Sequence, residues 1–508
     1  MGIHVHLRRL RALFAPAALV PFGGAAQAAV VISTSATQNM SCQAGVCTPT
    51  AKKAVLNVGD LANMLASGDT KVVADSAARD IEFKAPLSWT STSRLTLDSY
   101  RSIVFQQPVS VTGTGALTIT TNDGGSGGDF WFEKKGHIEF WDVSSSLTID
   151  GSSYTLVNTI QQLATAVSDD PFGRYALANN YDAAADGTYS QPPVAATFSG
   201  TFTALGNAVK ELTLNDKAPN SNVGFFASTA SGSLVRDFRL EHAKIVGGSV
   251  ANGGTEAVGS LVGYNSGALL YVSTSRTSIS ALTGAFIGGL VGFNAGSITY
   301  SSTSGGVKGN MQTAVGGLSG SGNVFGFIGA SHADVTVDGG GGYYAGGLIG
   351  DNRNSGIDQS YASGSVGGAS IYNGGLVGSN EGTINNSYAI GSVSGGPSTY
   401  DGGFVGSTGG SVARSYSIGA VTSQGATEVG GFTGNNLGGF ADNYWDVDTS
   451  GFGRRKGCGE PIDCDGLTGL TTTQFHSGLP IGFDPNVWGQ KPNINNGYPY
   501  LLANPPPK

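Results

Sequence analysis

A five-residue phrase, G-G-L-V-G, recurs seven times between Val258 and Gly434 at an almost constant interval. The apolar residues at its centre are 29, 28, 30, 28, 28 and 28 positions apart: Leu261, Leu290, Leu318, Leu348, Leu376, Phe404 and Phe432. A period of this length is typical of stacked-coil proteins, in which each unit buries its apolar face against its neighbours. The repeat therefore predicts a β-solenoid, and it constrains architecture more than chemistry.

The columns of the aligned repeat predict different roles. Because neighbouring strand residues face opposite sides, we expect the Leu/Phe column to point inward. The next column should then be outward or half-buried; it comprises Val262, Val291, Ser319, Ile349, Val377, Val405 and Thr433. Glycine stands two residues before and two after the Leu/Phe column in every copy. That placement indicates either a positive φ or a close backbone approach.

Asparagine fills a further column, four residues after the Leu/Phe position, in five of the seven copies: Asn265, Asn294, Asn352, Asn380 and Asn436. We favour a ladder of stacked amides, each bonding the next coil. The alternative is that asparagine tolerates the turn geometry. Tyrosines also recur beside the coils, at Tyr343, Tyr344, Tyr361, Tyr372, Tyr388, Tyr400 and Tyr416. An exposed ladder and a buried stripe remain equal alternatives for them.

Composition agrees with a β-rich repeat protein. Of 508 residues, 81 are glycine and only 12% are charged, against roughly 7% and 25% in ordinary globular proteins. Disorder is disfavoured because 40% of the residues are hydrophobic and recur periodically. The net charge of −8, without a basic stripe, argues against nucleic acid as a partner.

Residues 1–28 have the pattern of a secretory signal peptide. Arg8, Arg9 and Arg11 precede an apolar stretch, and Ala26-Gln27-Ala28 forms an A-x-A cleavage site. No other segment approaches the ~18 apolar residues of a membrane span, so no transmembrane segment is expected after signal removal. We therefore expect a secreted or cell-surface protein, with the periplasm as the alternative.

Four cysteines form two close pairs, Cys42 with Cys47 and Cys458 with Cys464. Two local disulfides are expected, because the pairs lie some 400 residues apart and the protein is predicted to be exported. Zinc is disfavoured because neither pair has C-x-x-C spacing with histidines nearby.

The chain divides into six segments on these patterns. After the signal peptide we expect a linker with the first disulfide (29–54), an N-terminal solenoid segment (55–150), a transition region (151–222), the G-G-L-V-G solenoid (223–441) and a C-terminal cap (442–508). Short helices are expected over 55–65 and 156–167. The predicted fold class is all-β: a right-handed parallel β-helix or β-solenoid with 28-residue repeats of two or three strands, short helices in the N-terminal half and a disulfide-bearing cap.

The sequence resembles the GLUG-motif proteins, and it is similar to β-helical exoproteins of the filamentous-haemagglutinin type from Gram-negative bacteria. The resemblance is carried by the repeats and by four flanking phrases: Y-x-L-V-N-T-I-Q-Q-L at 154–163, F-S-G-T-F at 198–202, N-Y-W-D-V-D-T-S-G at 443–451 and N-N-G-Y-P-Y-L at 495–501. It implies a secreted or surface-associated, often adhesin-like β-helix, and it carries over no catalytic residue. The chain departs from that group in having its one Asn-Pro at Asn504-Pro505.

Two segments invite a chemical interpretation. Gly124 to Trp131 fits a calcium-binding nonapeptide once, but that motif works in tandem, so a glycine turn is favoured. Asp442, Asp446 and Asp448 form the densest carboxylate group. Sugar-cutting hydrolases use carboxylate pairs, yet a solvated cap is the favoured interpretation because sequence spacing cannot set their separation. There is no H-E-x-x-H motif, and no metal or cofactor is expected.

The sequence therefore favours an exported, non-enzymatic scaffold that adheres to host cells, matrix or glycans. A polysaccharide-degrading enzyme on the same β-helix is the first alternative. A structural component of a larger surface assembly is the second. The sequence sets no oligomeric state.

Overall fold

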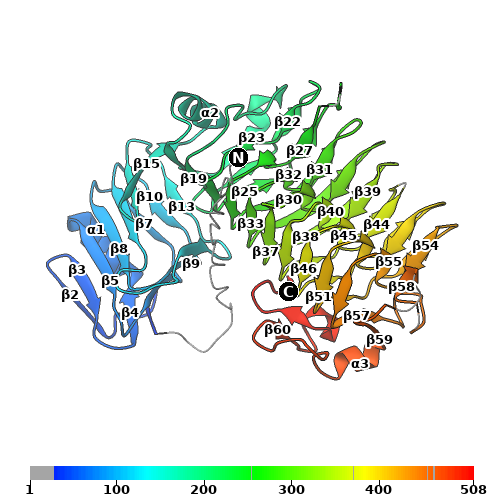
Figure 1. Ribbon diagram of the computed structural model, residues 1–508. Helices are drawn as coiled ribbons and strands as arrows, with labels where there is room; N and C mark the ends of the chain where they lie inside the picture. The colour runs from blue at the N-terminus through cyan, green and yellow to red at the C-terminus, as the bar shows by residue number, and fades with distance from the viewer. Residues whose placement is uncertain (1–27, 253, 370, 455, 461–463, 508) are drawn as a thin grey trace, which may run out of the picture.

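The computed structural model describes residues 28–252, 254–369, 371–454, 456–460 and 464–507. The chain is an all-β parallel solenoid of about 16 turns with few helices, which confirms the predicted fold class (Figure 1). Apart from Ala28, the predicted signal peptide lies outside the described residues. Within the described part of the chain, no helix is long and apolar enough to cross a membrane.

The N-terminal coils form a first solenoid segment, coloured blue to cyan in Figure 1. Its parallel strands stack into sheets with the order β12 (Phe130–Phe132), β9 (Ile103–Phe105), β6 (Asp80–Phe83), β1 (Ala29–Ser33), β4 (Lys53–Asn57) and the order β13 (Ile138–Phe140), β10 (Val109–Val111), β7 (Leu87–Trp89). A further face holds β5 (Thr70–Ala74), β8 (Arg94–Ser99), β11 (Ala116–Thr120) and β14 (Ser146–Ile149). Alternating apolar residues of these strands, such as Leu95 and Leu97, fill one continuous core.

The expected linker over 29–54 is instead part of this first segment. Strand β1 pairs in parallel with both β4 and β6. Strands β2 (Met40–Gln43) and β3 (Val46–Pro49) form an antiparallel hairpin in which Cys42 and Cys47 are directly opposite and joined by a disulfide. The Ser/Thr-rich stretch misled the prediction because β1 contributes only two alternating core residues, Val30 and Ile32.

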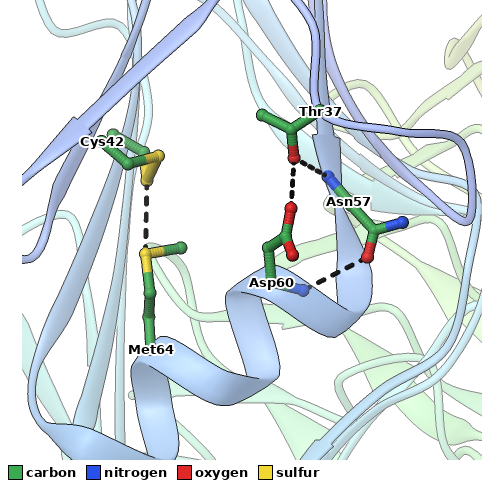
Figure 2. The surroundings of a disulfide bond; sticks show 6 residues. Thr37, Cys42, Asn57, Asp60 and Met64 are labelled. Atoms are coloured by element: carbon green, nitrogen blue, oxygen red, sulfur yellow. Dashed lines mark hydrogen bonds between the residues drawn. A yellow bond between two sulfur atoms is a disulfide. The ribbon is translucent and has the colours of Figure 1, made fainter.

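Three α-helices flank the coils: α1 (Val58–Ser67), α2 (Ile160–Asp169) and α3 (Thr472–His476). Helix α1 begins at Asn57, whose side chain accepts the backbone N–H groups of Gly59 and Asp60. Figure 2 shows this cap beside the hairpin disulfide, whose Cys47 sulfur lies 3.8 Å from Met64 Sδ. The first two helices begin later than expected because their N-caps fix the start, and α3 was not expected.

The transition region continues the parallel stacking. Strand β15 (Ser152–Val157) pairs with β16 (Arg174–Leu177), which pairs with β19 (Thr201–Thr203). The two solenoid segments meet between β13 and β19 in Figure 1. There the backbone N–H of Ile138 donates to Leu205 O at 2.9 Å, and the buried Asn207 amide donates to Ile138 O at 2.8 Å.

Each G-G-L-V-G coil contains four strands, or five where the strand of the fourth column is divided in two, which is more than the two or three expected. The first column is the sheet β22 (Asn222–Val223), β27 (Ala257–Gly259), β31 (Phe286–Gly288), β35 (Ala314–Gly316), β39 (Tyr344–Gly346), β44 (Tyr372–Gly374), β49 (Tyr400–Gly402), β54 (Glu428–Gly430). The second is β23 (Phe226–Thr229), β28 (Val262–Asn265), β32 (Val291–Asn294), β36 (Ser319–Gly322), β40 (Ile349–Asn352), β45 (Val377–Asn380), β50 (Val405–Thr408), β55 (Thr433–Asn436), β58 (Cys458–Glu460). We call these the first and second sheets.

The remaining two columns complete the coil. The third holds β24 (Leu234–Arg236), β29 (Ala268–Leu270), β33 (Ser297–Thr299), β37 (Phe327–Gly329), β41 (Gly356–Asp358), β46 (Thr383–Asn385), β51 (Ser411–Ala413) and β56 (Gly439–Ala441). The fourth includes β25 (Arg239–Glu241), β30 (Ser273–Ser280), β34 (Ser302–Lys308), β38 (His332–Asp338), β42 (Tyr361–Ala362), β47 (Tyr388–Ala389), β52 (Tyr416–Ser417), β57 (Asn443–Asp446) and β59 (Leu467–Leu470).

All seven members of the Leu/Phe column are fully buried, and so are all seven members of the next column. The expectation that the second set would be outward or half-buried is therefore wrong. Leu261 lies in the bend between β27 and β28, not within a strand. Strand alternation does not hold across a bend, so Leu261 and Val262 both point into the core.

The repeated glycines are explained by close backbone approach. They have no positive φ. At Gly374, an added Cβ would overlap the carbonyl oxygen of Val377 and would lie 2.6 Å from the backbone nitrogen of Gly406 in the next coil. The first and second sheets thus pack backbone against backbone, which only glycine allows.

A second corner, between the third and fourth columns, was not predicted. One residue per coil has a φ of 44° to 55° there, and none of the eight is glycine: Asp237, Tyr271, Tyr300, Ala330, Gln359, Asn386, Arg414 and Asp442. Each directly follows a strand of the third column. Left-handed backbone costs an L-residue roughly 1–2 kcal/mol, so the stacked pairing on both sides must hold these corners in place.

We predict that Gly374→Ala lowers the free energy of unfolding by about 1–3 kcal/mol or more, because the methyl group has no space between the two sheets. Denaturant titration followed by circular dichroism measures the change. Gly396→Ala is the matched control, since its Cβ would meet no atom within 4 Å. Equal stability of the two variants would contradict the close-approach explanation.

Candidate functional site

Three half-buried tyrosines stand in register on the outside of the first sheet. Tyr344, Tyr372 and Tyr400 are paired residues of β39, β44 and β49. Their ring centroids are 5.7 Å and 5.2 Å apart from one coil to the next. Parallel in-register stacking therefore places identical rings one coil apart along the solenoid.

The aromatic surface continues toward the N-terminal coils. Phe286 occupies the same column two coils earlier, and its ring lies 5.4 Å from that of Phe293 on β32. Phe293 in turn stacks on Tyr264, with centroids 5.1 Å apart. Alanine at position 314 interrupts the column. We call the half-buried set the aromatic row: Tyr264, Phe286, Phe293, Tyr344, Tyr372 and Tyr400.

Polar side chains border this aromatic row. Arg353 places its guanidinium 5.2 Å from the centre of the Phe286 ring and bonds the carboxylate of Asp351. In the later coils the second sheet offers the half-buried Ser379 and Ser407 in the column that Tyr264 and Phe293 occupy earlier. Rings and hydrogen-bonding groups therefore alternate across one face.

Burial and neighbouring groups change the pKa values of two tyrosines in the aromatic row. Burial raises the pKa of the Tyr344 phenol, and the nearby Asp351 carboxylate raises it further, while Arg353 opposes the change. Burial likewise raises the pKa of Tyr372, with smaller contributions from Tyr400 and Glu428. The phenols thus stay neutral hydrogen-bond donors at physiological pH.

The other tyrosines belong to a separate, covered stripe. Tyr361, Tyr388 and Tyr416 stack face to face on the fourth column, with centroids 4.6 Å and 5.1 Å apart, and all are buried. The C-terminal segment covers them with an apolar cluster made of Phe475, Phe483, Trp488, Tyr498 and Leu501. Both alternatives left open by the sequence therefore occur, on different columns. The remaining tyrosine, Tyr343, is exposed beside Tyr344.

Hydrogen bonds fasten this covering segment to the coils. Asn495 Nδ2 donates to the Tyr416 hydroxyl at 2.8 Å, and the Tyr444 hydroxyl donates to Ile481 O at 2.8 Å. Further back, Asn504 Oδ1 lies 2.9 Å from Nδ1 of the half-buried His332. The segment from 475 to 504 therefore forms a strap along the tyrosine stripe.

The asparagine column makes two kinds of bond. Asn265 donates its amide to Asn294 Oδ1, and Asn352 donates to Asn380 Oδ1, both at 2.7 Å. The same oxygens serve the local turn: Asn294 Oδ1 accepts the Gly296 backbone N–H at 3.3 Å, and Asn380 Oδ1 accepts the Gly382 backbone N–H at 3.2 Å. At the far end, the Asn436 amide lies 3.5 Å from Cys464 Sγ, and Cys464 is disulfide-bonded to Cys458.

The three cap aspartates do not form an open carboxylate pair. Asp446 is fully buried and accepts the hydroxyls of Thr472 and Tyr498, both at 2.7 Å. Asp448 accepts the Thr472 backbone N–H at 2.9 Å, while Asp442 is exposed at a left-handed corner. These contacts give Asp446 a structural role in holding the cap to the last coils.

The segment from Gly124 to Trp131 is a turn that leads into β12, which begins at Phe130. Asn122 closes it by accepting the Gly128 N–H at 2.7 Å and donating to Gly128 O at 2.9 Å. Asp129, at its end, pairs with Arg236 at 2.9 Å. Among the described residues, no group of three or more His, Cys, Asp or Glu side chains is placed to hold a metal ion.

The chain has a distant similarity to solved structures. No protein-family model matches the chain, and no curated protein does. Among solved structures, the chain is similar to an "IgA1 Protease", with 18% identity and a TM-score of 0.34 over 56% of this chain and 20% of that one. It is also similar to a "putative immunoglobulin A1 protease from Bacteroides ovatus", with 15% identity and a TM-score of 0.35 over 69% of this chain and 92% of that one. The chain thus spans about a fifth of the first structure's length.

These names correct one prediction from the sequence. The absence of a recognised catalytic motif led to the prediction of a protein without enzymatic activity. Both similar structures carry the name of an enzyme, so that prediction is withdrawn. At these identities and TM-scores, the likeness assigns neither an activity nor a site to this chain.

We predict that Asp446→Asn lowers the free energy of unfolding by about 1–3 kcal/mol, because an amide donor replaces an oxygen that accepts two buried hydroxyls. Thermal unfolding monitored by near-UV circular dichroism reports the change through the cap tryptophans. The control Asp442→Asn alters an exposed side chain and should leave stability unchanged. If Asp446→Asn left the free energy of unfolding unchanged, the structural role of Asp446 would be contradicted.

Proposed function

We propose that the protein is an exported, adhesin-like β-solenoid that binds glycans through the aromatic row. The observation that carries this proposal is the in-register series of half-buried rings on one face, from Tyr264 to Tyr400. The signal-peptide pattern and the resemblance to haemagglutinin-type exoproteins favour export and surface adhesion. A solenoid suits this task because each coil repeats the same surface at a fixed spacing.

Glycans fit this face better than protein or matrix partners do. Protein interfaces have an apolar core that excludes water, whereas these rings alternate with hydroxyls and charges such as Ser379, Ser407 and Arg353. A sugar ring is itself amphipathic, with an apolar face and hydroxyls at its edge. Tyrosine offers the matching combination, a flat apolar body with a polar end. In the coils of Tyr344, Tyr372 and Tyr400, the second sheet thus offers groups that bond hydroxyls: Asp351, Ser379 and Ser407.

The triple variant Tyr344→Ala, Tyr372→Ala, Tyr400→Ala should weaken glycan binding at least tenfold, since each aromatic contact contributes about 0.5–1.5 kcal/mol. Glycan arrays identify a ligand for the mature protein, and titration calorimetry then gives the dissociation constants. The expected ligands are polysaccharides with accessible pyranose faces.

A matched control removes exposed aromatic side chains elsewhere. Trp141 and Phe172 are 67% and 73% exposed and lie in the N-terminal half. The double variant Trp141→Ala, Phe172→Ala should bind like the natural protein. Absence of any glycan ligand above background, or equal loss in both variants, would refute the proposal.

A further inference from the structure

A pocket of about 120 Å³ lies where the two solenoid segments meet. One water needs only roughly 10–15 Å³ of such space, so the pocket admits a molecule of several heavy atoms. The loop between β12 and β13 supplies one wall, and the start of the repeat segment supplies the other. The lining side chains are Phe132, Lys134, Asp237, Arg239, Tyr271 and Ser273.

A buried guanidinium group lies beside this pocket and holds the surrounding side chains in place. Arg236 donates to Asp129 at 2.9 Å and 3.2 Å, to Asp237 at 2.6 Å and to Phe130 O at 2.7 Å. Its guanidinium carbon also lies 3.9 Å from the centre of the Phe130 ring. Because two carboxylates surround it, Arg236 is fully engaged and holds the two segments in one geometry.

Two polar groups at the pocket are buried and lack a hydrogen-bond partner among the described residues. They are Oδ1 of Asp237 and Nε of Arg239. The Asp237 carboxylate uses its other oxygen for Arg236, so Oδ1 is the one left over. Buried polar groups are nearly always paired in native proteins. Their presence on one pocket is therefore typical of a site whose partner comes from outside the chain.

The charges at the pocket sum to an excess of positive charge. Among the lining residues, Lys134 and Arg239 carry two positive charges and Asp237 carries one negative charge, so 2 − 1 leaves +1 in a chain of net charge −8. Lys134 sits on an exposed turn and donates to Gln106 Oε1 at 3.0 Å. Two cations thus line a pocket in which one carboxylate oxygen, Oδ1 of Asp237, can still accept a hydrogen bond.

Aromatic rings close the sides of the pocket. Tyr271 stacks on Tyr300 with centroids 5.1 Å apart, and Phe132 stacks on Phe105 with centroids 5.2 Å apart. Each lining ring is therefore held from behind by a second ring, which restricts its rotation. The hydroxyl of Ser273 adds a further donor and acceptor at the rim.

We propose that this pocket binds one acidic sugar residue, a hexuronate, of the glycan. Arg239 and Lys134 hold its carboxylate, Asp237 accepts a sugar hydroxyl, and Tyr271 and Phe132 flank the ring. A neutral sugar lacks the anion that the two cations require, and a simple anion lacks the hydroxyl and the ring. The inference rests on the proposed glycan binding for its biological context, but the pocket is tested with a free monosaccharide.

The experiment titrates the full-length mature protein with glucuronate, glucose, acetate and inorganic sulfate, followed by calorimetry or ligand-observed NMR. Glucuronate should bind at least tenfold more tightly than glucose and than either simple anion. Arg239→Gln and Lys134→Gln should each weaken glucuronate binding about tenfold, because each removes a charged hydrogen bond. Lys244→Gln, on an exposed lysine of the neighbouring strand β26 (Lys244–Val246), is the matched control.

The outcomes separate this inference from the proposed function. Equal binding of glucuronate, acetate and sulfate, or no loss in Lys134→Gln with its fold intact, would overturn the pocket assignment. If glycan binding is then still lost in the triple tyrosine variant, the proposed function stands without the pocket. If glucuronate binds as expected but no glycan depends on the aromatic row, the pocket stands and the proposed function fails.

Discussion

Backbone pairing between successive coils is the constraint on which the structure depends. Strands of the repeat segment pair in parallel with their equivalents one turn later, so residues lie over the same position of the next coil. The register shifts between β30 and β34, at Thr274 and Thr277. Because of this parallel stacking, a favourable contact made in one coil is repeated in the next and forms a row along the solenoid. The Leu/Phe core, the amide bonds, the buried tyrosine stripe and the half-buried aromatic row are all products of the same register.

Register also explains why glycine is so abundant. The first and second sheets approach until their backbones touch, and Gly374 and its equivalents stand where a side chain would collide. The loss of glycine's conformational freedom is offset by burial of a Leu or Phe at every bend and a second apolar or hydroxyl residue beside it. The high glycine content of the sequence is therefore a direct consequence of the tight packing between these two sheets.

Much of this fold could be predicted from the 28-residue period alone, because periodicity directly reports stacking. The features of the fold that could not be predicted lie at the bends between strands. The corner at Leu261 reversed the assignment of Val262, and the left-handed corners carry residues as different as Tyr271, Ala330 and Arg414. The candidate site was harder still. Tyrosine recurs in both rows, and only the fold shows that Tyr372 faces outward while Tyr388 lies under the C-terminal segment. The pocket joins Lys134 to Arg239 across more than 100 residues, and no local pattern marks such a contact.

The strap over the tyrosine stripe has a consequence for the evolution of the array. Solenoids ordinarily gain or lose units readily, since each contacts only its neighbours. Here Asn504 reaches back to His332, 172 residues earlier, while Tyr498 is anchored at Asp446. The strap therefore spans a fixed number of coils. Inserting or deleting one coil between those anchors would displace the tyrosines beneath the strap by one coil. Duplication of a coil can lengthen the array on the N-terminal side of His332. Between His332 and Asp446, the strap fixes the number of coils.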